Sequence, residues 1–141
     1  RQWALLTGPL SAVCAGVLVF GLVRGPVLQG ASPGLVARAI SLAQGSPVLA
    51  SSTIDEQVAL AGGSIAVGDP LDAFPARQQV AYLDWLQGSR QALAALGPSV
   101  RVILVLRRDL ARQAVARDPA FAPAGGDAQA LLYARRSPGL S

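Results

Sequence analysis

The stretch VRVILVLRRDLARQAVARDP, residues 100–119, decides the fold of this chain. Within its first part, residues 102–105 form a continuous apolar run, which is typical of a β-strand covered on both faces. A helix is predicted directly after it over residues 110–117, with Asp109 as its N-cap and with Asp118 and Pro119 at its end. A doubly covered strand followed by a helix is typical of an α/β domain built in three layers.

The same alternation of strands and helices continues on both sides of this stretch. Ser32 followed by Pro33 is a favourable helix start, and Thr53 stands three residues before Glu56, the spacing of a capping box, with Ser52 as an alternative cap. The pattern favours a three-layer, mainly parallel sheet with a C-terminal antiparallel hairpin. The predicted segments are helix 33–44, strand 47–50, helix 54–61, strand 64–67, helices 75–88 and 90–96, strand 100–106, helix 110–117 and hairpin 121–134.

Residues 3–23 carry no charged side chain. As a helix they would extend about 31 Å, which matches the hydrocarbon core of a membrane, so a transmembrane helix is predicted; a signal anchor and a buried helix are the alternatives. Because the chain contains no methionine, we expect this helix to be the last span of a longer protein. The expected organisation is a transmembrane helix at 1–24, a linker at 25–34, an extracytoplasmic α/β domain at 35–136 and a disordered tail at 137–141.

The composition excludes several functional classes. All twelve basic residues are arginines. The chain after residue 24 contains ten of them and eight acidic residues, so its net positive charge is small and its arginines are scattered, which argues against a nucleic-acid partner. The chain has no histidine and a single cysteine, Cys14, so the usual zinc sites, disulfides and Ser-His nucleophiles are excluded. We therefore expect no metal and no cofactor, and any catalysis would have to use carboxylates or arginines.

The ends of the predicted parallel strands hold the candidate ligand-binding residues, because sheets of this kind bind ligands at their carboxyl edge. Hydroxyl groups, carboxylates and guanidinium groups there suit an anion or a sugar phosphate. Each of these residues also has an ordinary alternative role as a helix cap, a turn residue or a solvated strand end. The candidates are Ser51, Ser52 and Thr53, then Asp69 and Asp72, then Arg107 and Arg108.

Several segments in this order resemble a known protein family. They are PVLAS at 47–51, SIAVGDPLDAF at 64–74, AYLDWLQG at 81–88, the stretch continued through ARDPAF to residue 121, and QALLYARR at 129–136. The chain resembles the C-terminal span and extracytoplasmic domain of bacterial multi-pass membrane proteins in the polyprenol-phosphate-sugar-dependent glycosyltransferase superfamily, the GT-C group. It departs from the group at DPLDAF, where many relatives have an acid followed closely by arginine and tyrosine.

The resemblance implies a location and partners for the chain. The domain would lie on the extracytoplasmic side of the bacterial cytoplasmic membrane, in contact with the lipid bilayer and with upstream transmembrane helices. A polyprenol-linked sugar would be bound by the parent protein, whose catalytic acid lies in an earlier loop. No residue of this chain therefore inherits a catalytic role.

Three functional hypotheses follow. The first is an accessory domain, without catalytic residues of its own, of a membrane glycosyltransferase-like protein. The second is a membrane-tethered module that binds a small anion or sugar phosphate, with Ser52 and Arg107 in contact with the ligand. The third is a structural domain of an uncharacterised membrane protein.

Overall fold

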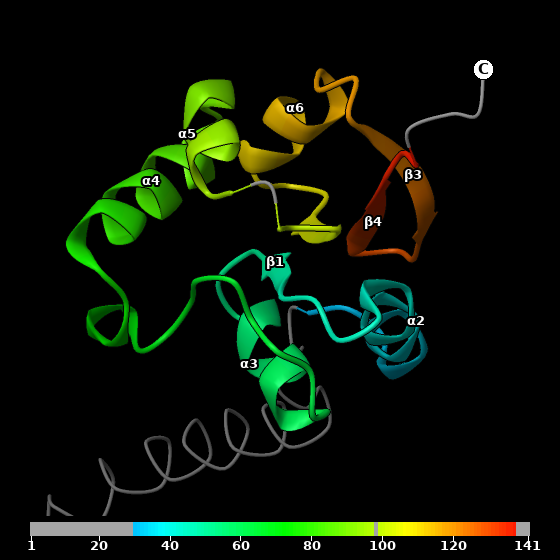
Figure 1. Cartoon of the computed structure of the whole chain (residues 1–141). Coiled ribbons are helices and arrows are strands. Elements are labelled where there is room, and N and C mark those ends of the chain that lie inside the picture. The colour runs from blue at the N-terminus through cyan, green and yellow to red at the C-terminus, as the bar shows by residue number, and fades with distance from the viewer. Residues whose placement is uncertain (1–29, 98, 138–141) are drawn as a thin grey trace, which may run out of the picture.

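The computed structural model describes residues 30–97 and 99–137 (Figure 1). Helices and strands alternate through most of this part of the chain, and a hairpin ends it. The elements are α2 (Pro33–Ala43), β1 (Val48–Ala50), α3 (Ile54–Leu60), the 3-10 turn η1 (Leu71–Ala73), α4 (Ala76–Leu86), α5 (Arg90–Ala95), β2 (Val102–Leu106), α6 (Ala111–Ala116), β3 (Phe121–Gly126) and β4 (Ala130–Arg135).

The four strands form one sheet in the order β1-β2-β4-β3. β1 and β2 are parallel, with Ala50 opposite Leu104, whereas β4 is antiparallel to both β2 and β3. The prediction of a mainly parallel sheet is therefore wrong, and the sheet is mixed. The reason is that β3 runs in the same direction as β2 but lies one position away, and β4 returns through the gap between them. The predicted C-terminal hairpin is present as β3 and β4.

The strand predicted over residues 64–67 is reduced to a single bridge. Ile65 pairs in parallel with Val48. The N–H of Val48 donates to the Ser64 carbonyl at 2.8 Å, and the N–H of Ala66 donates to the Val48 carbonyl at 2.9 Å. Beyond this point the chain leaves the sheet, so the segment borders β1 without extending the sheet as a named strand.

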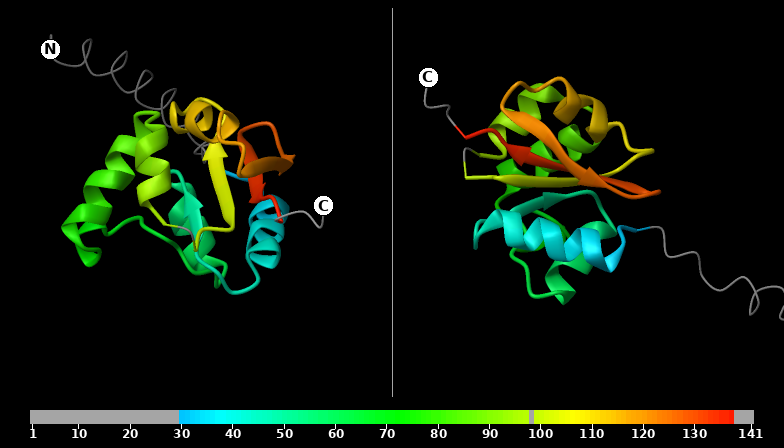
Figure 2. Two further views of the ribbon diagram at one scale, coloured as in Figure 1. Left: turned by 45° about the horizontal axis from the view of Figure 1, so that its top comes forward. Right: turned by 90° about the vertical axis from the view of Figure 1, so that its right-hand side faces the viewer.

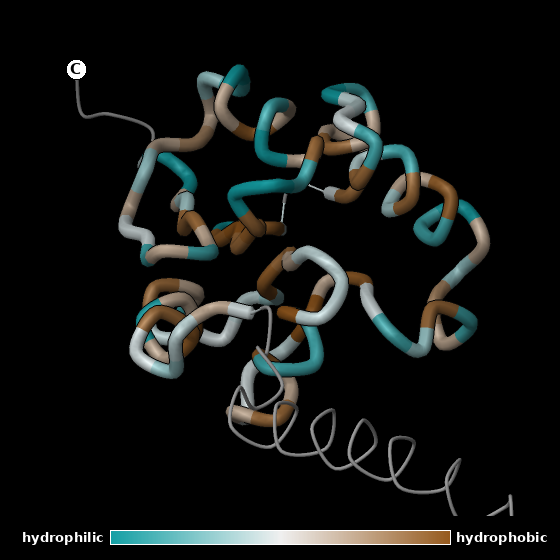
Figure 3. Tube along the Cα trace, turned by 180° about the vertical axis from the view of Figure 1, so that it is seen from behind, coloured by the Kyte–Doolittle hydropathy of each residue, from teal (hydrophilic) through white to brown (hydrophobic). Residues whose placement is uncertain are grey.

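The sheet is covered on both faces. Figure 2 shows α2 and α3 on one side of the sheet and α4, α5 and α6 on the other. All five residues of β2 are buried, and their side chains alternate between the two cores: Leu104 packs in the core below α2 and α3, whereas Ile103 packs in the core below α4 to α6. The prediction of a doubly covered strand is confirmed. In Figure 3 hydrophobic segments lie between the layers, and the outer helices show hydrophobic and hydrophilic residues in alternation.

The predicted transmembrane helix lies outside the described residues. Within residues 30–97 and 99–137 no helix is long and apolar enough to cross a membrane. The longest helices there, α2 and α4, have 11 residues each, about 16 Å of helix against a hydrocarbon core of about 30 Å. The predicted fold class is thus corrected to a small mixed α/β domain.

The local start signals are confirmed in one helix and wrong in two. Ser32 caps α2, because its Oγ accepts the N–H of Leu35 at 3.4 Å, and α2 begins at Pro33, inside the range predicted as a linker. Thr53 precedes α3 without a capping hydrogen bond from its side chain, so the predicted capping box is absent. Asp109 does not cap α6, which follows Leu110 and has no side-chain cap.

Candidate functional site

The carboxyl ends of β1 and β2 lie side by side and border a cavity of about 420 Å³. The segment after β1 forms one wall, the segment after β2 forms another, and the end of α4 contributes a leucine. Four polar residues and three leucines line the cavity: Ser52, Thr53, Arg108, Asp109, Leu86, Leu106 and Leu110. The predicted strand-end edge is thus hollowed where the parallel strands meet.

Ser51 holds the two strand ends together below the cavity. Its side chain is buried, with 0% of its surface exposed. Its Oγ accepts the N–H of Leu106 at 3.2 Å, and its own N–H donates to the Leu104 carbonyl at 3.0 Å. Ser51 therefore extends the pairing of β1 with β2 by one residue, and it does not line the cavity.

Ser52 and Thr53 are exposed residues that line the cavity. Thr53 has a positive φ of 74°. A β-branched residue rarely adopts this conformation, which costs about 1–3 kcal/mol. Residues that are held in strained backbone conformations of this kind are concentrated at binding sites. The backbone there turns from β1 into α3 without a glycine and leaves a threonine side chain at the wall of the cavity.

The two consecutive arginines after β2 have different surroundings. Arg108 lines the cavity. Like Thr53, Arg108 also has an interaction of its own within the protein. The Nε of Arg107 donates to the Asp127 carbonyl at 2.7 Å, and the N–H of Arg107 donates to the Gln129 carbonyl at 2.8 Å. Arg107 thus binds the turn of the β3–β4 hairpin, and the structure does not bring it to the cavity.

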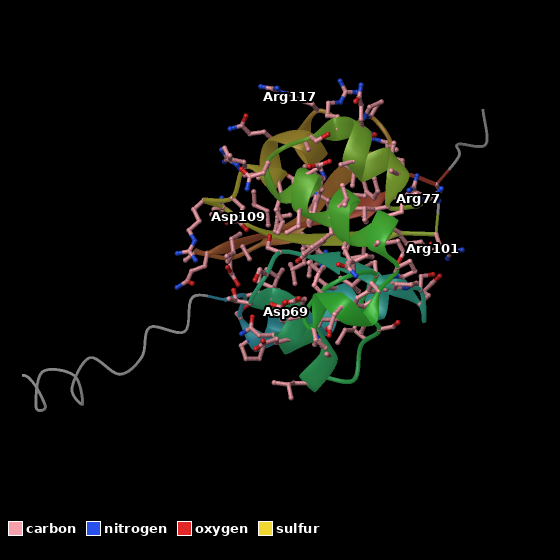
Figure 4. All side chains as sticks on the ribbon, turned by 90° about the vertical axis from the view of Figure 1, so that its left-hand side faces the viewer. Asp69, Arg77, Arg101, Asp109 and Arg117 are labelled. Carbon is pink, nitrogen blue, oxygen red and sulfur yellow. The ribbon has the colours of Figure 1, made fainter. Side chains whose placement is uncertain are left out.

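The two predicted carboxylates do not line the cavity either. The N–H of Asp69 donates to Oδ2 of Asp55 at 2.8 Å, and Asp72 is an exposed residue of η1. Figure 4 places Asp69 and Asp109 at the side of the domain opposite Arg77 and Arg101, consistent with the carboxyl edge of the parallel strands. Within the described ranges, no three His, Cys, Asp or Glu residues are grouped so that they could hold a metal ion.

Two residues near this edge were not singled out as candidates from the sequence. Asp109, which was expected to cap a helix, lines the cavity. Tyr82 of α4 is buried, and its hydroxyl donates to the Ala50 carbonyl at 2.8 Å. Burial, followed by the charges of Asp55, Asp69 and Asp109, raises the pKa of Tyr82 above its usual value. The three carboxylates therefore act on the Tyr82 hydroxyl. Extending the strand-end rule by one residue would have found Asp109.

The cavity combines groups that suit a ligand with several hydroxyl groups. The Ser52 and Thr53 hydroxyls can donate and accept hydrogen bonds, Arg108 can only donate, and Asp109 in its ionised form can only accept. The three leucines offer an apolar wall for the C–H face of a sugar ring.

Comparisons of the chain with protein-family models, with curated proteins and with solved structures find no match.

Proposed function

We propose that residues 30–137 form an accessory, non-catalytic domain of a larger glycosyltransferase-like membrane protein, and that the cavity at the ends of β1 and β2 receives the sugar part of a ligand. The family assignment rests on the sequence segments quoted above. The proposed binding role rests on the cavity, in which two hydroxyl groups after β1 and an arginine and a carboxylate after β2 line one hollow.

The electrostatics favour a hydroxyl-rich ligand over a purely anionic one. An anion held by Ser52 and Arg107 would need the Arg107 guanidinium, which does not line the cavity and lies against the hairpin turn, where its Nε donates to the Asp127 carbonyl. Asp109 adds a negative charge to the wall of the cavity. Carboxylates oppose a bound anion but accept hydrogen bonds from sugar hydroxyls.

The binding role is tested with the full chain in a nonionic detergent and a panel of neutral monosaccharides, by saturation-transfer NMR. We expect a signal from at least one sugar. We expect that signal to fall about tenfold in Asp109→Asn and in Arg108→Gln, because each removes charged hydrogen bonds worth about 1.5–3 kcal/mol. Asp72→Asn and Arg90→Gln, at exposed positions outside the cavity, are the matched controls. Absence of any signal, or equal loss in the controls, would contradict the proposal.

The accessory role is tested separately in the protein that contains this chain. Transfer of sugar from a polyprenol-linked donor is measured with and without residues 25–141, and with Asp109→Asn in the whole protein. We expect the deletion to reduce transfer and the substitution to raise the apparent KM for the sugar substrate. Undiminished transfer after deletion would overturn the accessory role and leave a purely structural domain as the alternative.

A further inference from the structure

Three arginines surround Tyr133 on the side of the sheet covered by α6. Arg112 and Arg117 belong to α6 and its C-terminal end, and Arg136 follows β4 directly. All three are exposed. In Figure 4 Arg117 lies at the outer surface of the layer that contains α6. Arg112, Arg117, Arg136 and Tyr133 are called the arginine surface below.

The arginine surface encloses two adjoining hollows. One has a volume of about 310 Å³ and includes Arg112 and Arg117 in its lining; the other has a volume of about 250 Å³ and includes Arg117 and Arg136. Ala116, Arg117 and Tyr133 line both, so Arg117 stands between them. In the part of the chain that the structure describes, the hollows share no lining residue with the cavity at the ends of β1 and β2. This surface is therefore a separate feature of the domain.

The positive charge of the arginine surface is not neutralised within the part of the chain that the structure describes. There the side chains of Arg112, Arg117 and Arg136 form no hydrogen bond or ion pair. Arg135 differs: its Nε donates to the Val100 carbonyl at 2.9 Å, and its guanidinium lies 4.7 Å from the centre of the Phe121 ring. Three guanidinium groups thus remain able to bind a ligand.

The surface also contains a hydroxyl group that the described structure does not use. Tyr133 is 7% exposed and lines both hollows. Its hydroxyl forms no hydrogen bond within residues 30–97 and 99–137. Among residues 30–97 and 99–137, Asp118 is the one acid that lines either hollow, and its Oδ1 accepts the N–H of Ala120 at 2.9 Å. The tyrosine hydroxyl can therefore add a donor beside the arginines.

We propose that the arginine surface binds a phosphate ester, with a diphosphate as the best-fitting group. Guanidinium groups bind phosphate oxygens through paired charged hydrogen bonds. Two adjoining hollows that share Arg117 give room for two linked phosphate groups. The buried aromatic ring of Tyr133 offers no exposed face on which a nucleic-acid base could stack.

The test is calorimetric titration of the full chain, in a nonionic detergent, with inorganic pyrophosphate. Arg117→Gln removes the arginine common to both hollows, and Arg90→Gln removes the same charge from an exposed position on α5. We expect Arg117→Gln to weaken binding about tenfold and Arg90→Gln to leave it nearly unchanged. Tyr133→Phe should give a smaller loss. Thermal unfolding of each variant confirms that it is folded.

A second arm distinguishes a soluble phosphate ester from a lipid-borne one. Phosphatidylcholine vesicles with and without phosphatidic acid are sedimented with the same proteins. Binding of pyrophosphate supports a soluble phosphate ester as the ligand. Binding only to vesicles with phosphatidic acid supports a lipid phosphate. In both cases the binding must be lost in Arg117→Gln. Binding in neither arm, or equal losses in Arg117→Gln and Arg90→Gln, would overturn the proposal.

Discussion

The Oδ2 atom of Asp55 accepts the backbone N–H of Asp69 at 2.8 Å, across 14 residues of sequence. The Oδ1 atom of Asp55 accepts the N–H of Glu56 at 2.9 Å. The carboxylate is fully buried at the start of α3. It therefore fixes the segment that leaves the edge of β1, next to the end of the strand that borders the candidate cavity.

Replacing Asp55 with alanine should destabilise the domain by about 3 kcal/mol, because two backbone donors lose their acceptors in a buried place. Asp55→Asn keeps one carbonyl oxygen and should lose about half as much. Urea unfolding followed by circular dichroism measures both values. Asp72→Ala, at an exposed position, is the control and should change stability by less than about 0.5 kcal/mol. Equal stability of Asp55→Ala and the control would show that the buried carboxylate has no structural role.

Gly68 should not accept a larger residue, because a Cβ atom there would overlap Oδ2 of Asp55. Gly68→Ala should cost about 1–3 kcal/mol by overpacking. Gly34→Ala is a matched control, since nothing lies within 4 Å of a Cβ at that position in α2, and it should be neutral or stabilising. The measurement is again urea unfolding. Gly68→Ala should also reduce the free energy of unfolding by less in an Asp55→Ala background than in the wild type. If the effects of the two substitutions simply added, the proposed overlap between the new Cβ atom and Asp55 would be contradicted.

Local patterns were sufficient to predict much of the fold. The apolar run that contains β2, the Ser32–Pro33 start of α2 and the C-terminal hairpin each depend on residues close in sequence, and each was found. The position of β4 between β2 and β3 depends on pairing between distant segments, which hydrophobic periodicity does not encode. The same holds for the missing caps at Thr53 and Asp109, since side-chain hydrogen bonds depend on the turn geometry.

The site was predictable to the level of segments only. The strand-end rule selected Ser52, Thr53 and Arg108, which line the cavity, together with Arg107, which binds the hairpin turn. Nothing in a pair of consecutive arginines indicates which one meets a neighbouring loop. Arg112, Arg117 and Arg136 come together because α6 packs against the hairpin. Their separation in the sequence gives no sign of this proximity.

Tyr82 should make the domain less stable in alkaline solution. Burial raises its pKa above the ordinary value near 10, so the folded state holds the phenolic proton more tightly than the unfolded state does. The resulting stability is fully present below pH 10 and is lost as the pH rises further. The urea midpoint should therefore fall only as the pH rises above about 10, and fall less in Tyr82→Phe than in the wild type. Tyr133→Phe, the control, should follow the wild type.

Tyr82→Phe should also reduce stability at neutral pH, by about 1 kcal/mol. The substitution removes the donor to the Ala50 carbonyl at the end of β1 and changes little else in volume. The urea midpoint at pH 7 measures the loss. An unchanged midpoint at pH 7 together with an unchanged alkaline slope would show that the hydroxyl does not support the strand end.

Asp127 should contribute stability that disappears in acid. Its Oδ2 accepts the N–H of Ser32 at 2.7 Å, and its Oδ1 accepts the N–H groups of Gln129 and Ala130 at 2.8 Å each. Burial tends to raise the pKa of this carboxyl, but the N–H donors outweigh burial and lower the pKa to about 2. The folded state thus favours the ionised form, and the stability that this provides is present above the ordinary pKa near 4 and is lost as the pH falls toward 2.

Asp127→Ala should therefore be less stable than the wild type at pH 7, and the difference between their urea midpoints should shrink as the pH is lowered from 4 to 2. The gain from the charge is modest because the carboxylate is near solvent, which screens it. Asp72→Ala, which removes an exposed carboxylate from η1, is the control and should show little difference from the wild type at either pH. A difference for Asp127→Ala that stays constant from pH 7 to pH 2 would mean that the loop is held by contacts other than the ionised carboxylate. In that case the link between the start of α2 and the hairpin turn would not depend on charge.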